Sequence, residues 1–217
     1  GENDITDAII PAPNLPFLHV LPAHPRLIGA EIELVNVMAR ETRLKRALEP
    51  VKGNYHYIFV DCPPSLGLLT VNTLTAADSV IVPIQCEYYA LEGLGQLLNS
   101  IRLVQRNLNA GLRIEGILLT MYDGRLNLAR QVADEARRYF GDRVYRTMIP
   151  RNVRLGEAPS FGQPIILYDI LSAGSSSYIE LAQELMFSGG KEARSDIATE
   201  QQGEARPRET VLQEGEQ

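Results

Sequence analysis

The amino-acid sequence predicts an α/β protein with a doubly wound, mostly parallel sheet and helices on both faces of that sheet. Three observations favour this class. Short apolar runs of strand length alternate with longer segments in which apolar residues recur at helical spacing. The runs are bounded by Pro, Gly, Asp or Asn, which are typical of strand ends. Because the runs are almost continuously apolar, we expect strands buried on both faces and joined by crossover helices.

The expected elements follow in order along the chain. The expected strands cover residues 17–23, 57–62, 79–85 and 114–123. The expected helices cover residues 26–48, 88–108, 126–140 and about 175–187, because their apolar side chains fall on one helical face. Parallel sheets bind ligands beyond the carboxyl ends of their strands, which directs attention to Asp61 and to residues 83–87, 121–123 and 150–152.

The composition is that of an ordinary globular chain. Its 217 residues are 45% hydrophobic and 22% charged, enough for a sizeable core in at most two domains. No run approaches the roughly 18 apolar residues of a membrane span, and the opening GENDITDAII lacks a signal-peptide pattern. The two cysteines, Cys62 and Cys86, favour a reducing cytoplasm over a disulfide scaffold. The three histidines are scattered, so we expect no zinc site.

The chain is expected to divide into one domain, residues 1–187, and a disordered acidic tail, residues 188–217. The tail has almost no apolar periodicity. It holds four basic and seven acidic residues and thus carries half of the formal net charge of −6. The remainder is only mildly acidic, which argues against a strongly basic nucleic-acid binder but allows a local basic patch.

The stretch YIFVDCPPSLG ends an apolar run on Asp61. A carboxylate at the end of a buried strand is costly unless it meets a cation or several donors. One interpretation is a Walker B acid that helps to hold Mg²⁺ beside nucleotide phosphates, and the alternative is an Asp that caps the next turn. Pro63 and Pro64 end the strand because they lack N–H groups. The stiff loop through Ser65 and Gly67 could couple a γ-phosphate to a neighbouring surface.

Four blocks in this order, YIFVDCPPSLG, VPIQCEYYALEGL, LLTMYDGR and IPRNVRLGEAPSFGQPI, together resemble the ParA/Soj family of chromosome- and plasmid-partitioning ATPases. The resemblance runs over residues 1–187. It implies a deviant-Walker P-loop ATPase fold that binds ATP and Mg²⁺ and forms a nucleotide-dependent homodimer. It also implies non-specific DNA binding by that dimer, stimulation by a ParB-type partner, no membrane partner, and a cytoplasmic, nucleoid-associated location.

Several residues match positions with known roles in that family. By this resemblance Asp61 is the Walker B acid, which contacts Mg²⁺ indirectly. Pro150 and Asn152 match the segment that wraps the adenine, where an apolar ring packs on the base and a carboxamide pairs with its edge. Met121 matches a position on the other side of the base. Without the resemblance, residues 150–152 would be interpreted as a loop and a helix N-terminus. The second switch loop of the family corresponds to Cys62, Pro63, Pro64, Ser65 and Gly67.

The family's phosphate loop, K-G-G-x-G-K-T, has no counterpart in this sequence. Such a loop supplies backbone N–H groups, a lysine and a hydroxyl for Mg²⁺. The three lysines, Lys45, Lys52 and Lys191, are not followed by Ser or Thr. In the family this loop lies upstream of the region that matches DITDAII. We therefore expect the sequence to be the C-terminal three-quarters of a ParA-type protein, with no catalytic residue of its own and no ATPase activity alone.

The DNA contacts of the family are made by scattered basic residues that bind phosphates. The candidates in this chain are Arg125, Arg130, Arg137, Arg138, Arg143, Arg146, Arg151 and Arg154, of which Arg143, Arg146 and Arg154 are selected. The alternative for each is a side chain that solvates a helix face. The stretch ILYDILSAGSSSY departs from the family, because apolar residues stand where Pro and basic residues are common, and DNA affinity through it is doubtful.

Three other functions compete with a partition ATPase. The main alternative is a non-catalytic ParA-like interaction protein that binds partners through the switch-loop face. A MinD-like membrane-cycling ATPase would need a basic, amphipathic C-terminal helix, and the tail is acidic and polar. A Rossmann dehydrogenase would need a G-x-G-x-x-G sequence, which the chain lacks.

Overall fold

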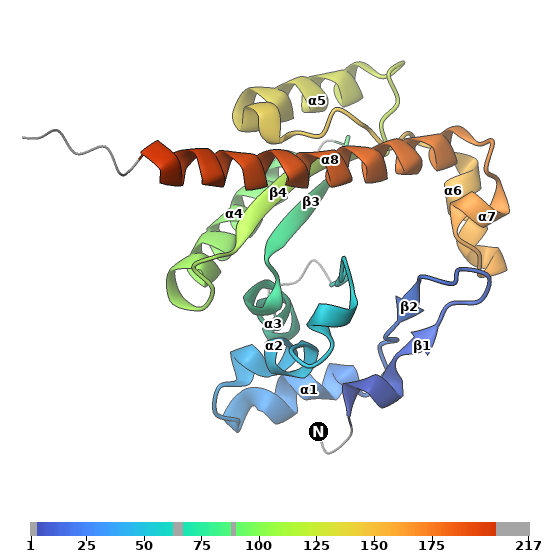
Figure 1. Cartoon of the computed structure of the whole chain (residues 1–217). Helices are drawn as coiled ribbons and strands as arrows, with labels where there is room; N and C mark the ends of the chain where they lie inside the picture. The colour runs from blue at the N-terminus through green and yellow to red at the C-terminus, as the bar shows by residue number, and fades with distance from the viewer. Residues whose placement is uncertain (1–3, 63–66, 88–89, 203–217) are drawn as a thin grey trace, which may run out of the picture.

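A computed structural model describes residues 4–62, 67–87 and 90–202 of the chain (Figure 1). At its centre, strands β3 (Ser79–Gln85) and β4 (Arg113–Thr120) pair in parallel, with one register shift between Val80 and Ile81. A third extended stretch, the 144–152 segment, runs parallel to β4 through the bridges Ile117–Val144 and Tyr122–Pro150. The strands expected at 79–85 and 114–123 are therefore present, and the connections between them are crossovers.

Helices cover both faces of this sheet. Helices α4 (Ala90–Asn107) and α5 (Asn127–Phe140) pack on one face, where Ile117 and Leu119 of β4 join the main buried cluster. The intervening Leu118 points to the other face, where Leu155, Leu181 and Leu185 pack against it. The last two belong to α8 (Ala173–Gln202), which crosses the sheet in Figure 1. The alternation follows from the two-residue period of a strand and confirms the predicted fold class.

Gly116 in β4 makes room for the ring of Tyr145, the second residue of the 144–152 segment. A Cβ atom added at Gly116 would lie 2.5 Å from Cε2 of Tyr145. Tyr145 is 5% exposed, and its N–H donates to the carbonyl of Ile117 at 3.0 Å. The close approach of the two backbones therefore requires glycine at this position.

The N-terminal region differs from the sequence-based expectation. Strands β1 (Ile10–Pro11) and β2 (His19–Val20) form a two-residue antiparallel pair, shorter than the strand expected at 17–23. The prediction of a single helix over residues 26–48 is wrong. The chain forms shorter helices on either side of Ala39, whose backbone is in the left-handed conformation (φ 54°). These helices are α1 (Leu27–Glu33), η2 (Leu34–Asn36), η3 (Arg40–Thr42) and α2 (Arg43–Leu48).

Residues 57–62 do not form the buried central strand that their composition predicts. They have no ladder partner within the described residues, and Tyr57 and Phe59 are 55% and 71% exposed. The two rings stack with centroids 6.1 Å apart. An apolar run becomes a strand only when a neighbouring backbone satisfies its N–H and C=O groups, and the described chain supplies no such neighbour here.

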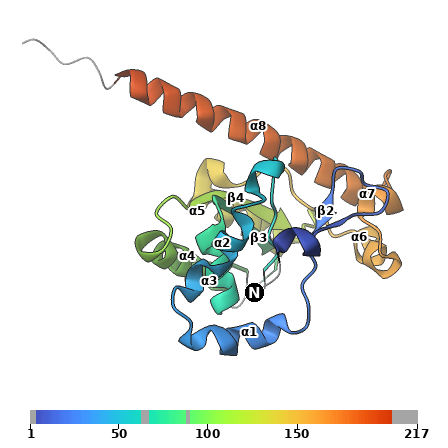
Figure 2. The ribbon, with the colours of Figure 1, turned by 60° about the horizontal axis from the view of Figure 1, so that its bottom comes forward.

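The C-terminal helix is longer than expected. Helix α8 continues to Gln202 and projects past the other elements in Figure 2, whereas disorder was expected from residue 188. The sequence KEARSDIATEQQ is rich in good helix formers and extends a helix that packing already anchors. The expected tail beyond residue 202 lies outside the described residues.

No helix in the described part of the chain combines the length and the hydrophobicity that a membrane span requires. The other helices are η1 (Ile5–Ala8), η4 (Lys52–Asn54), α3 (Leu68–Ala76), η5 (Gly141–Arg143), α6 (Val153–Glu157), η6 (Ala158–Phe161) and α7 (Ile165–Tyr168).

Candidate functional site

The carboxyl ends of the parallel strands meet at one edge, formed by residues 85–87, 121–123 and 150–152 and called here the carboxyl edge. Just beyond β3, the N–H of Cys86 donates to the carbonyl of Thr120 at 2.9 Å. The Thr120 hydroxyl donates to the carbonyl of Ile84 at 3.2 Å. These bonds fix the ends of β3 and β4 side by side.

The chain after β4 interlocks with the 144–152 segment. The N–H of Tyr122 donates to the carbonyl of Ile149 at 3.1 Å, and the N–H of Arg151 donates to the carbonyl of Tyr122 at 3.0 Å. Pro150 and Asn152 flank Arg151 in sequence, and Met121 precedes Tyr122. The structure thus brings Met121, Pro150 and Asn152 to the same edge of the sheet.

Met121 adopts a left-handed backbone conformation with φ 54°. A non-glycine residue in this region costs about 1 kcal/mol or more, and such outliers concentrate where a binding site needs a fixed backbone. The residue is 36% exposed. The apolar thioether is therefore available to a ligand at the carboxyl edge.

Asn152 caps the N-terminus of α6. Its backbone is extended (φ −139°, ψ 127°), and its Oδ1 accepts a hydrogen bond from the N–H of Arg154 at 2.9 Å. The capping hydrogen bond uses only Oδ1 of Asn152, so the two N–H donors of its Nδ2 group are not used by the cap. Asn152 can therefore serve as a helix cap and also donate to an acceptor on a base, with Pro150 partly buried beside it.

Two ion pairs lie at the carboxyl edge. Nη2 of Arg151 lies 2.6 Å from Oε1 of Glu87, which joins the chain after β3 to the 144–152 segment. Arg125 donates from Nε to Oδ1 of Asp123 at 2.9 Å and from Nη2 to Oδ2 at 2.7 Å. These side-chain hydrogen bonds are the main cause that lowers the pKa of Asp123 to about 2. Asp123 is therefore a fixed, ionised group whose oxygens are already occupied by Arg125.

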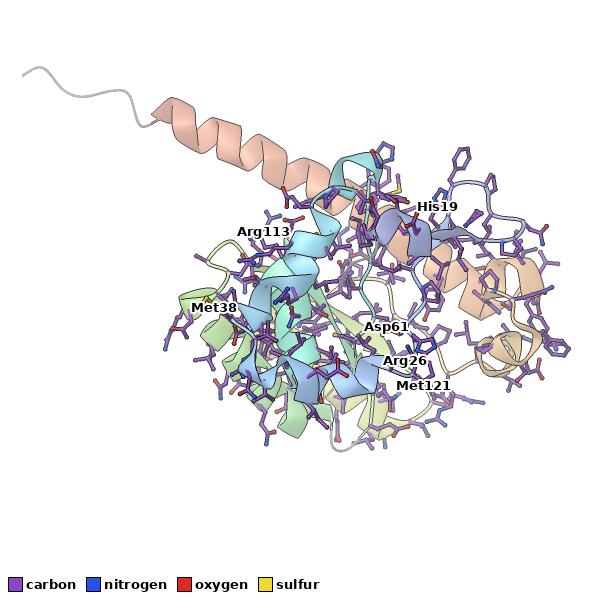
Figure 3. All side chains as sticks on the ribbon, turned by 90° about the horizontal axis from the view of Figure 1, so that it is seen from below. His19, Arg26, Met38, Asp61, Arg113 and Met121 are labelled. Atoms are coloured by element: carbon purple, nitrogen blue, oxygen red, sulfur yellow. The ribbon has the colours of Figure 1, made fainter. Side chains whose placement is uncertain are left out.

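Asp61 is exposed near the end of the extended stretch 57–62, and its carboxylate has no hydrogen bond or ion pair with another described residue. Figure 3 labels Asp61 and Met121, which belong to different segments, because Asp61 follows the extended stretch 57–60 and Met121 follows β4. Burial raises the pKa of the neighbouring Cys62 thiol, and the negative charge of Asp61 raises it further. A carboxylate is a hard oxygen ligand of the kind that Mg²⁺ takes, but the strand that Asp61 was expected to end is not formed, and its role at Mg²⁺ stays a prediction. Within the described residues no group of three or more His, Cys, Asp or Glu is placed to hold a metal, so phosphate and water oxygens would have to complete the coordination.

Only the two ends of the predicted switch loop, Cys62 and Gly67, belong to the part of the chain that the structure describes. Pro63, Pro64 and Ser65 lie outside the described residues. Gly67 precedes α3 in an extended conformation, and a side chain at this position would collide with the carboxylate of Glu31. Gly67 therefore lies against Glu31 of α1.

The three arginines selected for DNA contact are not brought together. Arg143 and Arg146 stand at the start of the 144–152 segment, whereas Arg154 follows its end, at the opposite edge of the sheet. Arg154 pairs with Glu157 at 2.9 Å and with Asp169 at 3.4 Å. Arg154 is therefore already engaged with acids.

Other features were not anticipated from the sequence. Glu184 of α8 accepts hydrogen bonds from the N–H groups of Arg146 at 2.8 Å and Thr147 at 2.9 Å. The only sequence signal for it is a pair of acids four residues apart in a helix. A hollow of about 350 Å³ lies between residues 12–18 and 161–167, and none of the predicted site residues lines it.

Comparison with known proteins gives consistent similarities. A family model described as "AAA domain" matches residues 1–114. The Bacillus subtilis "Sporulation initiation inhibitor protein Soj" is 62% identical over 186 residues, which cover 86% of this chain and 73% of that protein. The Myxococcus xanthus "Chromosome partitioning protein ParA" is 60% identical over 172 residues, which cover 79% of this chain and 61% of that protein.

Solved structures agree with these similarities. Cobyrinic acid a,c-diamide synthase from Mycobacterium smegmatis with bound ADP and magnesium has a TM-score of 0.71 at 36% identity, over 85% of this chain and 67% of that one. The apo form of McdA from Cyanothece has a TM-score of 0.74 at 16% identity, over 84% and 73% of the two chains, which shows likeness of fold alone.

Proposed function

The chain belongs to the ParA/Soj family of chromosome-partitioning ATPases, and on this premise we propose that its carboxyl edge binds the adenine end of ATP while Asp61 serves the accompanying Mg²⁺. We further propose that ATP-dependent homodimerisation, non-specific DNA binding and a ParB-type partner belong to the complete protein. Its place would be the cytoplasm, at the nucleoid.

The observation that carries the nucleotide site is the assembly of Met121, Pro150 and Asn152 at one edge. The two apolar side chains offer surfaces for the two faces of a planar base. The Nδ2 group of Asn152, which the helix cap leaves free, offers hydrogen bonds to acceptors on the edge of the base. Apolar faces with one directional polar group are what adenine recognition requires.

The second part of the site concerns charge. Bound Mg²⁺ would supply positive charge to the phosphates, and the Asp61 carboxylate would hold that ion directly or through water. This sequence contains no Gly-Lys-Ser/Thr, so the described residues offer the triphosphate no lysine cradle. We therefore expect weak nucleotide binding and no hydrolysis above background by this polypeptide alone. Robust turnover that an Asp61→Ala variant abolishes would contradict this expectation.

The adenine site is tested with Asn152→Ser. Serine is a good N-cap, so α6 keeps its cap while the Nδ2 donors are lost. We expect an ATP affinity about tenfold lower than that of the wild type, corresponding to about one lost hydrogen bond in free energy. Equal affinities in a titration followed by NMR would refute the assignment of Asn152 to the base.

The DNA contact is tested by electrophoretic mobility shift of the ATP-loaded complete protein at low and high salt. Phosphate contacts release counterions, so we expect binding that weakens steeply as salt rises. Arg143→Ala and Arg146→Ala should reduce this binding. Absence of any salt-sensitive shift would remove the DNA claim.

A second candidate is a non-catalytic ParA-like interaction protein. The exposed and stacked rings of Tyr57 and Phe59, immediately before the switch loop, favour it because exposed aromatic pairs mark contact surfaces. A Tyr57→Ser/Phe59→Ser variant that keeps ATP binding but loses partner binding would support this function. If the variant keeps both ATP binding and partner binding, the interaction function is refuted and the nucleotide function remains.

A further inference from the structure

Helix α8 holds the 144–152 segment through one carboxylate. The two oxygens of Glu184 accept separate hydrogen bonds from the consecutive N–H groups of Arg146 and Thr147, at 2.8 and 2.9 Å. Hydrogen bonds to an ionised acceptor are about twice as strong as neutral ones. Burial is the largest single influence and raises the pKa of Glu184, but the two backbone hydrogen bonds, a side-chain hydrogen bond with Thr147 and the charge of Arg146 together lower the pKa below its usual value. The carboxylate therefore stays charged when it binds the segment.

Apolar contacts place Glu184 where it can do this. Leu181 and Leu185 of α8 pack against the cluster that contains Tyr145 and Ile149 of the segment. Leu181 stands one helical turn before Glu184 on the same side of α8, and Leu185 directly follows Glu184, so the packing of these leucines keeps the carboxylate near the segment. The helix thus contacts the segment through a polar anchor between two apolar ones.

The anchored segment leads directly into the proposed adenine site. After Thr147, the N–H of Ile149 donates to Leu119 at 2.9 Å and the N–H of Arg151 donates to Tyr122 at 3.0 Å. These hydrogen bonds fix the backbone of the segment relative to Leu119 and Tyr122, up to the residue before Asn152. A displacement at Arg146 and Thr147 would therefore shift the carboxyl edge relative to Met121.

We propose that Glu184 is a positioning residue, which sets the place of Pro150 and Asn152 at the adenine by holding the backbone of Arg146 and Thr147. This inference rests on the proposed nucleotide function. It also connects that site to α8, the helix that projects past the rest of the molecule in Figure 2. A partner that shifts α8 would accordingly change the affinity for the adenine nucleotide.

The test compares Glu184→Gln with Glu180→Gln in the full chain. Glutamine keeps the size of the side chain, but its NH₂ group cannot accept the second backbone hydrogen bond. Glu180 is exposed one turn earlier on the same helix and provides the matched control. Two quantities are measured by NMR: amide hydrogen exchange without ligand, and affinity for Mg²⁺·ATP and for inorganic tripolyphosphate.

For Glu184→Gln we expect amide exchange about tenfold faster at Tyr122 and Arg151, with less than about twofold change at the β3–β4 amide of Cys86. ATP affinity should fall about tenfold while tripolyphosphate affinity stays constant, because only the base contact is displaced. Glu180→Gln should change none of these quantities.

Two results would overturn the proposal. Exchange that rises as much at Cys86 as at Arg151 would mean that Glu184 only stabilises the fold. Unchanged ATP affinity in Glu184→Gln would mean that the segment does not position the base. If the wild type binds no ATP, the nucleotide function itself fails, and unchanged exchange at Tyr122 and Arg151 would then separately refute the role of Glu184.

Discussion

The contact between Gly116 and Tyr145 permits a quantitative prediction for Gly116→Ala. The new methyl group would lie 2.5, 2.9 and 3.0 Å from three carbons of the Tyr145 ring. Carbon atoms in contact are ordinarily about 3.5–4.0 Å apart, so the ring must retreat by about 1 Å. The ring is 5% exposed, and the backbone of Tyr145 is bound to β4. Overpacking of this kind typically costs about 1–3 kcal/mol.

A smaller effect opposes this cost. Replacement of glycine in a strand removes its unfavourable entropy of ordering and stabilises the protein by about 0.5–1 kcal/mol. The net loss in free energy of unfolding should therefore be about 1–2 kcal/mol. With a urea m-value of about 2 kcal/mol/M, the unfolding midpoint should fall by about 0.5–1 M.

The control variants isolate the clash. Gly95→Ala adds a methyl group in α4 that meets nothing within 4 Å, so it should stabilise the protein by about 0.5–1 kcal/mol. In a Tyr145→Leu background the clash disappears, and Gly116→Ala should then cost at least about 1 kcal/mol less than in the wild type. A Gly116→Ala protein as stable as the wild type, or a coupling energy near zero with Tyr145→Leu, would refute the packing argument.

Three further predictions concern stability. Asn152→Ala should cost about 1 kcal/mol in urea unfolding by removing the cap of α6, whereas Asn152→Ser should cost only a few tenths; equal losses would contradict the cap. The pKa of Asp123 is lowered from 3.8 to about 2, so its stabilising contribution is complete above pH 3.8 and is lost as the pH falls toward 2. Thermal unfolding of Asp123→Asn should therefore differ from wild type more at pH 5 than near pH 2, and a constant difference would count against the pair with Arg125. Gly174→Ala places a methyl group 2.6 Å from Leu155 but should cost less than Gly116→Ala, because the Leu155 side chain is partly exposed and can rotate; a larger cost would show that α8 is more rigidly packed there.

The sequence predicts the centre of the fold well because the signals there are local. The apolar runs at 79–85 and 114–123 are bounded by turn residues, and both are strands. The helices after them are amphipathic and form where expected. Elsewhere the outcome depends on distant parts of the chain. Residues 57–62 have strand composition but no strand to pair with among the described residues, and the left-handed Ala39 that divides 26–48 has no sequence signature.

The same division holds for the site. The rule that parallel strands bind ligands at their carboxyl ends places residues 121–123 after an expected strand, whereas the role given to residues 150–152 depended on the family resemblance, because no strand was expected before them. The side-chain partners at that edge could not be predicted from the sequence pattern. Arg151 and Glu87 are separated by 64 residues, and Glu184 lies 37 residues from Thr147. Such pairs depend on tertiary packing, to which local periodicity gives no access.

The central claim is that the carboxyl edge receives an adenine nucleotide with its metal near Asp61. Paramagnetic Mn²⁺, added with ATP to isotope-labelled protein, tests it most directly, because the ion broadens NMR signals of nearby amides. We predict the strongest broadening at Asp61 and Cys62, with ATP-dependent shifts at Met121 and Asn152, and loss of the broadening in Asp61→Ala. Broadening that is the same without ATP, or confined to acidic groups away from this edge, would contradict the claim.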